Sequence, residues 1–467
     1  MGQPETASPD PLAEVRQRAY QAIDQWLDGF LPLLSTPEAP TLLELSEHLF
    51  KTRSQLLGAC LQAILDRILS HYTQLTQTSC PTCARRLYRK RLEPKKLTTL
   101  HGTVEIQRPY FYCVACRQGF HPLDEALELA REVHQYDVQQ KLVGLAAELP
   151  YGRAVEQFET LTGVPVGEHV SHETLNRIAK EIRFEDVIPE RAEIERRIEK
   201  ACPANGEPPV LVVAVDGAHS PIRPAGGRRD KRGPGYWRET KGFRLYLSSA
   251  EGRILQLASW HQIETAKQLA QHLQLAAERI PLDRVTVALV GDGAAWVWNA
   301  MEGSFPEAHQ VLDYYHCAEH IWSVADARYG GDSLEAQSWA ETTLVRLYMG
   351  WVSDVLGGLK RMKPTSDSAA EEVSKLINYL EEHRHRVQYY EAREQGLPRG
   401  SGGIESANKF LVHARLKRSG AWWLEANGNG MLRLRCAIYN GTFDRLFKKY
   451  VSNKRKNASK NLKDSCS

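Results

Sequence analysis

Four cysteines occur in two closely spaced pairs. Cys80 and Cys83 form the first Cys-x-x-Cys pair, and Cys113 and Cys116 form the second. This spacing lets each turn direct two thiolates toward one tetrahedral ion, and four protein ligands leave no open position for catalysis. The pattern therefore predicts a structural Zn²⁺ site in a zinc-ribbon-like module, with thiol redox chemistry as the alternative.

Two aspartates follow Val-rich segments in matching contexts. Residues 210–215 precede Asp216, residues 285–290 precede Asp292, and a glycine follows each aspartate. Continuous apolar runs of this kind are typical of strands buried on both faces, so we expect each strand to end at its aspartate. Neighbouring strands would bring both carboxylates to the edge where open α/β sheets bind ligands. Ordinary turn chemistry at an Asp-Gly dipeptide is the alternative for each aspartate.

A third acid, Glu405, lies in the first turn of a predicted helix behind the glycine-rich loop 400–403. Backbone N–H groups and the helix dipole favour an ionised carboxylate there and tolerate phosphate nearby. Three carboxylates suit Mg²⁺, and two such ions ~3.5–4 Å apart serve phosphodiester chemistry. Asp216, Asp292 and Glu405 are therefore candidate metal ligands.

The segments around these acids have a readable order. Strand-like runs at 210–215, 243–248 and 254–260 are followed by a helix from Ala266, a strand, a helix from Ala294 and a strand at 310–312. This β-β-β-α-β-α-β order predicts an α/β fold with a mixed sheet flanked by helices. Between Cys317 and Leu397 the strand signal disappears, which predicts an all-helical insertion.

The region before the sheet contains a possible helix-turn-helix. Val155, Phe158 and Leu161 indicate one helix, and Ser171 can cap a second helix whose polar face carries Arg177 and Lys180. The connector is longer than in the usual motif, so two plain packed helices are the alternative to DNA binding.

Further basic and aromatic side chains are candidate DNA contacts, with a solvated surface or core packing as the alternatives. They are Arg228 and Arg229 in a basic loop, Lys409, Arg415, Lys417 and Arg418 after Glu405, and Trp423. The last twenty residues contain seven Lys or Arg and one Asp. They predict a disordered basic tail that contacts phosphate or simply aids solubility.

The composition excludes some classes of protein. With 467 residues, 25% charged and 42% hydrophobic, the chain should fold as several globular domains, and its net charge of +3 alone predicts no nucleic-acid partner. No apolar run is long enough for a bilayer, and the polar N-terminus, 1–11, has no signal-peptide core, so we expect a cytoplasmic protein with no membrane partner.

We expect seven segments. They are a helical N-terminal region for oligomerisation or DNA binding (1–78), the zinc-ribbon-like module (79–122), the helical region with the possible helix-turn-helix (123–205), the first part of the core (206–316), the helical insertion (317–397), the last part of the core (398–447) and the basic tail (448–467).

The ordered set of motifs resembles a known family. The Asp216-Gly and Asp292-Gly-Ala-Ala-Trp segments, Asp313-Tyr-Tyr-His316, the insertion, and Gly-Gly-Ile-Glu405-Ser-Ala-Asn-Lys look like DDE transposases. The match is nearest to bacterial insertion-sequence transposases of the ISKra type, which are similar in plan to Mutator-like and hAT transposases. The resemblance covers about Cys80 to Phe447 and leaves the first 75 residues and the tail unmatched.

The resemblance implies an RNase H-like core in which Asp216, Asp292 and Glu405 are catalytic with Mg²⁺ or Mn²⁺. His316 would lie beside the active site, although a buried, hydrogen-bonded histidine is the alternative. The implied reaction cleaves double-stranded DNA at the terminal inverted repeats and joins the freed 3′ end to target DNA. A homodimer or larger synaptic complex at the bacterial nucleoid is implied. Alternatives are a domesticated DNA-binding protein without cleavage, and a nuclease without strand transfer.

Overall fold

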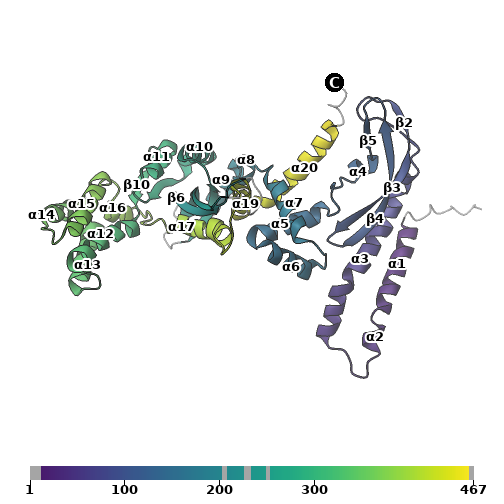
Figure 1. The fold of residues 1–467 in the computed structure, drawn as a ribbon, viewed down its shortest axis with the longest axis horizontal. Helices are drawn as coiled ribbons and strands as arrows, with labels where there is room; N and C mark the ends of the chain where they lie inside the picture. Colours follow the sequence, from purple (N-terminus) through teal and green to yellow (C-terminus); the bar gives the residue numbers. More distant parts are fainter. Residues whose placement is uncertain (1–11, 202–207, 226–232, 249–252, 462–467) are drawn as a thin grey trace, which may run out of the picture. The chain divides into compact units, whose positions relative to one another are not determined.

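The computed structural model describes residues 12–201, 208–225, 233–248 and 253–461. The chain divides into two compact units (Figure 1). Unit 1 comprises residues 1–178 together with 447–467, and unit 2 comprises residues 179–446. Across the described residues, no helix combines the length and the apolar character that crossing a bilayer requires.

Unit 1 begins with a helical hairpin, as the spacing of its apolar residues predicts. Its helices are α1 (Ala13–Asp28), the short α2 (Leu31–Leu34) and the long α3 (Leu42–Thr73). A reciprocal capping box between Thr41 and Glu44 starts α3, because it satisfies backbone N–H groups that have no partner within the helix. Figure 1 shows α1 alongside α3.

A small antiparallel β region follows the hairpin. Its strands are β1 (Gln77–Ser79), β2 (Arg86–Tyr88), β3 (Arg91–Thr99), β4 (Gly102–Cys113) and β5 (Gln118–Phe120). β1 pairs with β2, and β3, β4 and β5 form a three-stranded sheet in that order. Leu69 of α3 packs with Leu97 and Val104 of this sheet in a buried apolar cluster, so the hairpin is anchored to the β region.

The possible helix-turn-helix lies among the helices that follow. They are α4 (Pro122–Ala126), α5 (Tyr136–Glu148), α6 (Tyr151–Thr162) and α7 (Glu168–Ala179). α6 ends at Gly163, whose φ of 72° is left-handed and so favours glycine. α7 begins at Glu168, so the prediction that Ser171 caps it is wrong. Ser171 is buried inside the helix, and the connector is only residues 163–167.

Unit 2 contains the mixed sheet that the sequence predicts. Its strands are β6 (Val210–Ile222), β7 (Tyr236–Ser248), β8 (Ile254–Gln262), β9 (Thr286–Gly291) and β10 (His309–Leu312), in the spatial order β10-β9-β6-β7-β8. β6, β7 and β8 are antiparallel neighbours, whereas β9 and β10 run parallel to β6. The α/β class and the mixed sheet are therefore confirmed.

Strand β6 is longer than predicted. The apolar run stops at Val215, but β6 continues through Asp216 to Ile222 because it stays paired with β7. Asp216 is therefore inside a strand rather than at its end.

Helices complete the core of unit 2. They are α8 (Phe184–Val187), α9 (Arg191–Ala201), α10 (Ala266–Ala277), α11 (Ala295–Ser304), α17 (Gly402–Asn408), α18 (Ala414–Leu416) and α19 (Glu425–Tyr439), with a 3-10 turn (Leu282–Arg284) and a π-helical turn (Lys409–His413) between them. Figure 1 shows the sheet between α10 and α11 on one side and α17 on the other.

The region after β10 is helical, as predicted. It consists of α12 (Tyr314–Tyr329), α13 (Leu334–Tyr348), α14 (Val352–Arg361), α15 (Asp367–Glu382) and α16 (Tyr389–Glu394). Arg386 anchors this insertion to the core, because its backbone carbonyl accepts a hydrogen bond from Leu312 of β10 and its guanidinium pairs with Glu302 of α11.

The C-terminal segment corrects a prediction. We expected residues 448–467 to be a disordered tail, but helix α20 runs from Phe443 to Asn461. Its first turns contain the buried apolar residues Leu446, Phe447 and Tyr450, and this apolar content explains why the helix extends into the basic segment. Residues 462–467 lie outside the described part of the chain.

Candidate active site and metal centre

Asp216 lies in a row of three cross-strand neighbours. It is opposite Gly242 of β7, which is opposite His261 of β8. Directly opposite residues point to the same face of a sheet, so Asp216 and His261 share one face. A Cβ atom at Gly242 would lie 2.1 Å from the His261 ring, so the imidazole fills the space that a side chain there would need.

Asn408, the last residue of α17, connects to this row. Its Nδ2 donates a hydrogen bond to Asp216 Oδ2 at 2.7 Å, and the Gly217 N–H donates to Asp216 Oδ1 at 2.6 Å. Complete burial lowers the pKa of His261 to about 3, although its interaction with Asn408 partly opposes this shift. His261 is therefore neutral at physiological pH.

Asp292 reaches the same edge of the sheet from β9. The last paired residues of the parallel strands β6 and β9 are Ala214 and Val290. Asp216 lies two positions after Ala214, and Asp292 lies two positions after Val290. The Ala294 N–H donates to Asp292 Oδ1 at 3.0 Å, so the carboxylate also stabilises the start of α11. The prediction that these two aspartates share an edge therefore agrees with the strand register.

Glu405 comes from the first turn of α17 and is exposed. Buried Arg244 of β7 holds the start of this helix by donating to the Gly403 carbonyl at 2.6 Å. A Cβ atom at Gly403 would lie 2.5 Å from the Tyr246 ring, so only glycine permits this close approach. The glycine-rich loop thus allows α17 to dock directly on β7.

Asp216 is affected by the two other acids. Burial is the main cause that raises the pKa of Asp216 to about 6, and the charges of Asp292 and Glu405 raise it further. Hydrogen bonds from Gly217 and Asn408 act in the opposite direction. Asp292 and Glu405 therefore each lie near enough to Asp216 for their charges to act on it, although the three acids are separated by 76 and 113 positions in the chain.

Asp313 and His316 lie at the start of the helical insertion. Asp313 is buried and caps α12, where its Oδ1 accepts from the His316 N–H at 2.8 Å. Its Oδ2 accepts from the Ser401 N–H just before α17. The His316 ring is partly exposed and contacts Glu319 and His320 on its own helix. Asp313 therefore positions the segment that carries Glu405, whereas the His316 ring contacts Glu319 and His320 within α12.

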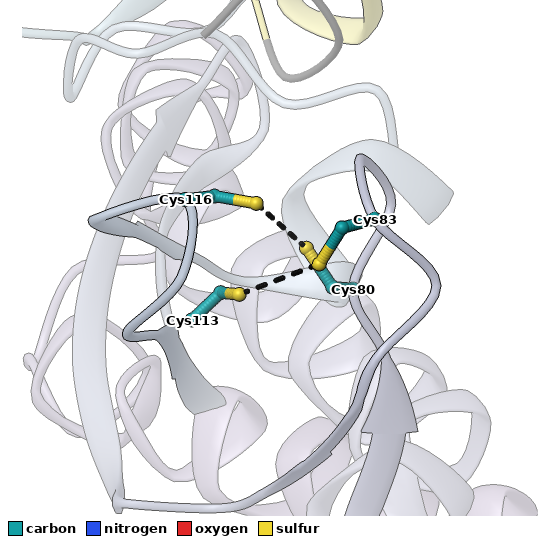
Figure 2. Close-up of side chains that lie close together, drawn as sticks. All are labelled: Cys80, Cys83, Cys113 and Cys116. Carbon is teal, nitrogen blue, oxygen red and sulfur yellow. Dashed lines mark hydrogen bonds between the residues drawn. The ribbon is translucent and has the colours of Figure 1, made fainter. Parts of the chain in front are cut away.

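The four cysteines of unit 1 converge, and Figure 2 shows their thiols directed toward a common centre. Cys80 Sγ is 3.8 Å from Cys116 Sγ, and Cys83 Sγ is 3.7 Å from Cys113 Sγ. Ala84, which follows the first pair, has a left-handed φ of 56°, and Arg117, which follows the second pair, has a left-handed φ of 53°. Both turns therefore have the same form.

Electrostatics and spacing fit a metal ion at the four cysteines. Burial raises the pKa of Cys80, but hydrogen bonds from the backbone of Cys83 and Thr82 and from the thiols of Cys83 and Cys113 lower it to about 6 overall. In the described residues, these cysteines are the one group of three or more potential ligands whose atoms all lie within 4.8 Å of one another. They can hold a metal ion, whereas the three acids are more widely spaced.

The candidate DNA contacts fall into three groups. Lys180, Lys409 and Arg418 are exposed, and Lys417 is half-buried. Arg415 is buried over the Trp423 ring, Trp423 is itself buried, and Arg177 contacts Glu132, Gln139 and Tyr450 within unit 1. These internal contacts disagree with a DNA-binding role for Arg415, Trp423 and Arg177. Arg228 and Arg229 lie outside the described residues.

Trp423 is packed in the core, the alternative to the DNA contact expected of it, whereas the preceding Trp422 is exposed. Trp423 Nε1 donates to the Leu416 carbonyl, and its backbone pairs with the end of β6. Trp422 is instead 42% exposed and lies 6.2 Å from the exposed Trp237 of β7, measured between ring centroids. The exposed aromatic surface is therefore formed by Trp422 and Trp237.

Several functional candidates were not identified from the sequence. Asn408 follows Glu405 by one helical turn, and this spacing was the available signal. Gly242, His261 and Arg244 became visible only through strand register and the docking of α17, neither of which a single sequence provides.

Comparisons with known proteins give a consistent family. A UPF0236 protein from the vanSb 3′ region of Streptococcus gallolyticus is 22% identical over 415 residues, which cover 87% of this chain and 86% of that protein. A UPF0236 protein of Caldanaerobacter subterraneus subsp. tengcongensis is 21% identical over 366 residues, covering 75% of this chain and 69% of the relative.

Among solved structures, a chain of the Drosophila P element transposase strand transfer complex is similar to 69% of this chain and 82% of its own length, with 10% identity and a TM-score of 0.25. The family described as uncharacterised protein family UPF0236 matches residues 36–449, and the chain belongs to this family.

Proposed function

We propose that this protein is a DNA transposase that cleaves phosphodiester bonds at transposon ends and transfers the freed strand into target DNA. The observation that carries the proposal is that Asp292, after β9, and Glu405, on α17, both lie near enough to Asp216 on β6 for their charges to raise its pKa. These residues occupy the positions that the resemblance to DDE transposases assigns to catalysis.

The architecture of unit 2 supports the proposal. Three antiparallel strands, β6, β7 and β8, are followed by β9 and β10 parallel to β6, with β6 in the centre. We interpret this order as an RNase H-like core with a helical insertion between β10 and α17. In such a sheet the acids lie where open α/β sheets bind ligands.

The acids fit divalent cations through their chemistry. Their donor set is all oxygen, which suits Mg²⁺ or Mn²⁺. Bound cations would offset both the burial and the repulsion that raise the pKa of Asp216. Asp216, Asp292 and Glu405 would hold the ions, which supply Lewis-acid activation of the attacking oxygen and charge stabilisation at the leaving oxygen. Ligands shared between two ions can be more widely spaced than ligands of one ion.

The remaining residues of the site orient these acids. Asn408 fixes one oxygen of Asp216, and neutral His261 packs beside it without adding positive charge. Asp313 accepts a hydrogen bond from Ser401 just before α17, and Arg244 donates one to Gly403 in its first turn. These two bonds hold α17, so Glu405 keeps its position relative to the aspartates. The contacts described for His316 give it no role beyond α12, and its catalytic role rests on the resemblance alone.

We propose Zn²⁺ as the ion at the four cysteines. A tetrahedral site with Zn–S distances of about 2.3 Å requires sulfur atoms about 3.8 Å apart. The Sγ atoms are 3.8 Å apart in the pair Cys80–Cys116 and 3.7 Å apart in the pair Cys83–Cys113. Four thiolates fill the coordination shell, so the ion would be structural. Its binding would stabilise the short strands β1, β2 and β5, which have little apolar core of their own.

Double-stranded DNA is the proposed partner, at the bacterial nucleoid. The exposed side chains of Lys409 and Arg418 follow the acidic helix α17, and Lys180 lies just after α7. Basic groups in these places would contact phosphates, while exposed Trp422 could stack on an unpaired base.

A strand-transfer assay tests the proposal. The full chain is incubated with Mg²⁺ or Mn²⁺, a DNA fragment carrying the sequences that flank its coding region, and a supercoiled target plasmid. Wild type and Asp283→Asn should give joined products, whereas Asp292→Asn should give none. Asp283 is the matched control because it is an exposed aspartate before β9, whereas Asp292 follows that strand.

The alternatives predict different outcomes in the same assay. Nicks without joined products would indicate a nuclease, and DNA binding without cleavage would indicate a domesticated DNA-binding protein. Cleavage by Asp292→Asn at the rate of wild type would refute the assignment of the active site.

A further inference from the structure

Helix α3 carries apolar side chains on a face that is open to solvent. Leu43, Phe50, Leu57 and Ile64 recur at intervals of seven residues, and Ile68 follows one turn later. Each of these five residues is between 42% and 68% exposed. We call them the α3 stripe. Because isolated exposed apolar residues are common but aligned ones are not, the stripe indicates an interaction surface.

The hairpin and the β region of unit 1 contact other sides of α3. Thr52 and Asp66 face α1, since Thr52 accepts a hydrogen bond from Trp26 and Asp66 pairs with Arg18. Gly58 faces the turn between β3 and β4 and the start of β4, since a Cβ atom there would lie 3.4 Å from the His101 carbonyl and 3.9 Å from the Thr103 carbonyl. At ~100° per residue, the α3 stripe lies roughly opposite the side that faces α1. The hairpin and the sheet therefore leave the stripe open to solvent. At its edge, the Arg53 guanidinium lies 3.5 Å from the centre of the Phe50 ring and donates a hydrogen bond to the Leu161 carbonyl of α6.

The seven-residue interval indicates the kind of partner. Apolar residues at every seventh position supply one of the two apolar positions of each heptad, and they stay on one side of a helix when a second helix packs along it. We propose that the α3 stripe binds the α3 stripe of a second copy of this chain, so that the N-terminal hairpins of two protomers form a dimer interface.

The area and the charges favour a second copy. Five large apolar residues about half exposed offer on the order of 500 Å², which is close to the apolar share of the ~800 Å² that each partner buries in a standard interface. Helix α3 contains three acidic residues (Glu44, Glu47 and Asp66) and three basic ones (Lys51, Arg53 and Arg67). Two copies therefore meet without net repulsion, whereas a helix that binds an anionic membrane is rich in Lys and Arg.

The proposal is tested by sedimentation velocity of the full chain without DNA. Wild type should be a dimer at micromolar concentration. The double variant Phe50→Glu/Leu57→Glu should dissociate at least about 100-fold more readily, because it places unpaired charges in an apolar seam. The matched control is Leu282→Glu/Leu334→Glu, which changes two exposed leucines of unit 2 and should stay dimeric.

A mixing experiment separates a specific interface from misfolding. Phe50→Lys/Leu57→Lys should also be monomeric alone, and an equimolar mixture of the Glu and Lys variants should form a heterodimer, because opposite charges then face each other in a parallel or an antiparallel pair. A monomeric wild type, an unchanged dimer in the Glu variant, or no association of the mixture would overturn the proposal. Because no DNA or catalysis is involved, these results are independent of the proposed transposase activity.

Discussion

Removing the charge of Asp216 should stabilise the metal-free protein at neutral pH. Burial and the nearby acids raise the pKa of Asp216 to about 6 from an ordinary value of 3.8. The folded state therefore binds more protons than the unfolded state between these two values, and its stability falls as the pH rises through them. Above pH 6 the full penalty of keeping an ionised carboxylate in this site is present.

The size of the effect follows from the shift. The shift of the Asp216 pKa from 3.8 to about 6 lowers the free energy of unfolding by about 3 kcal/mol at pH 7.5. At pH 4.5 the same shift lowers it by about 1 kcal/mol. Asp216→Asn cannot accept both hydrogen bonds that Asp216 accepts from Gly217 and Asn408, and the lost bond costs about 1 kcal/mol. The substitution should therefore stabilise the metal-free protein by about 2 kcal/mol at pH 7.5 and have almost no effect at pH 4.5.

Thermal unfolding after metal removal with a chelator provides the assay. For a unit of this size, about 2 kcal/mol should raise the midpoint by about 5 °C at pH 7.5. Added Mg²⁺ should stabilise wild type but not Asp216→Asn, since only wild type retains the complete set of ligands. Asp283→Asn, at an exposed aspartate, should change neither midpoint. An equal gain at both pH values, or no gain at pH 7.5, would refute the account of the Asp216 environment.

Three further predictions concern single side chains. Asn408→Ala should raise the pH at which Mg²⁺ binding is half-maximal, because it removes a hydrogen bond that lowers the pKa of Asp216. Calorimetric titration across pH 5–8 would measure this midpoint, and an unchanged midpoint would contradict the prediction. Cys113→Ser should release the bound zinc, as metal analysis would show, and zinc retained at one equivalent would rule out the site. Trp422→Ala should weaken binding of single-stranded DNA with little loss of stability, whereas buried Trp423→Ala should cost about 3–5 kcal/mol of unfolding free energy; equal stability losses would disprove the distinction.

The sequence was most informative where a pattern depends on local physics. The Val-rich run before Asp292 predicts a buried strand and its aspartate at the correct edge, since hydrophobicity and β-branching are properties of the segment itself. The cysteine pairs likewise predict converging thiols because their turns are local. By contrast, Asp216 was expected at a strand end, because the polar half of β6 is a strand only through its pairing with β7.

The roles of side chains were harder to predict than the helices and strands. Arg177 and Arg415 belong to basic segments, and nothing in the local sequence distinguishes an arginine that packs internally from one that contacts phosphate. The same limit applies to Trp422 and Trp423, whose burial depends on a backbone pairing with the end of β6. The His261 environment also required knowledge of which residue lies opposite Gly242.

The position of Glu405 explains how a long insertion is compatible with one candidate active site. The chain leaves the core after β10 and returns at α17, and both points are tied to Asp313, whose carboxylate accepts from the His316 N–H and the Ser401 N–H. The Tyr314 N–H also donates to the Arg399 carbonyl at 2.9 Å, so a second bond joins the two ends. Because these bonds hold the ends of the insertion together, the helices between them can vary in length while the glutamate keeps its place beside the aspartates.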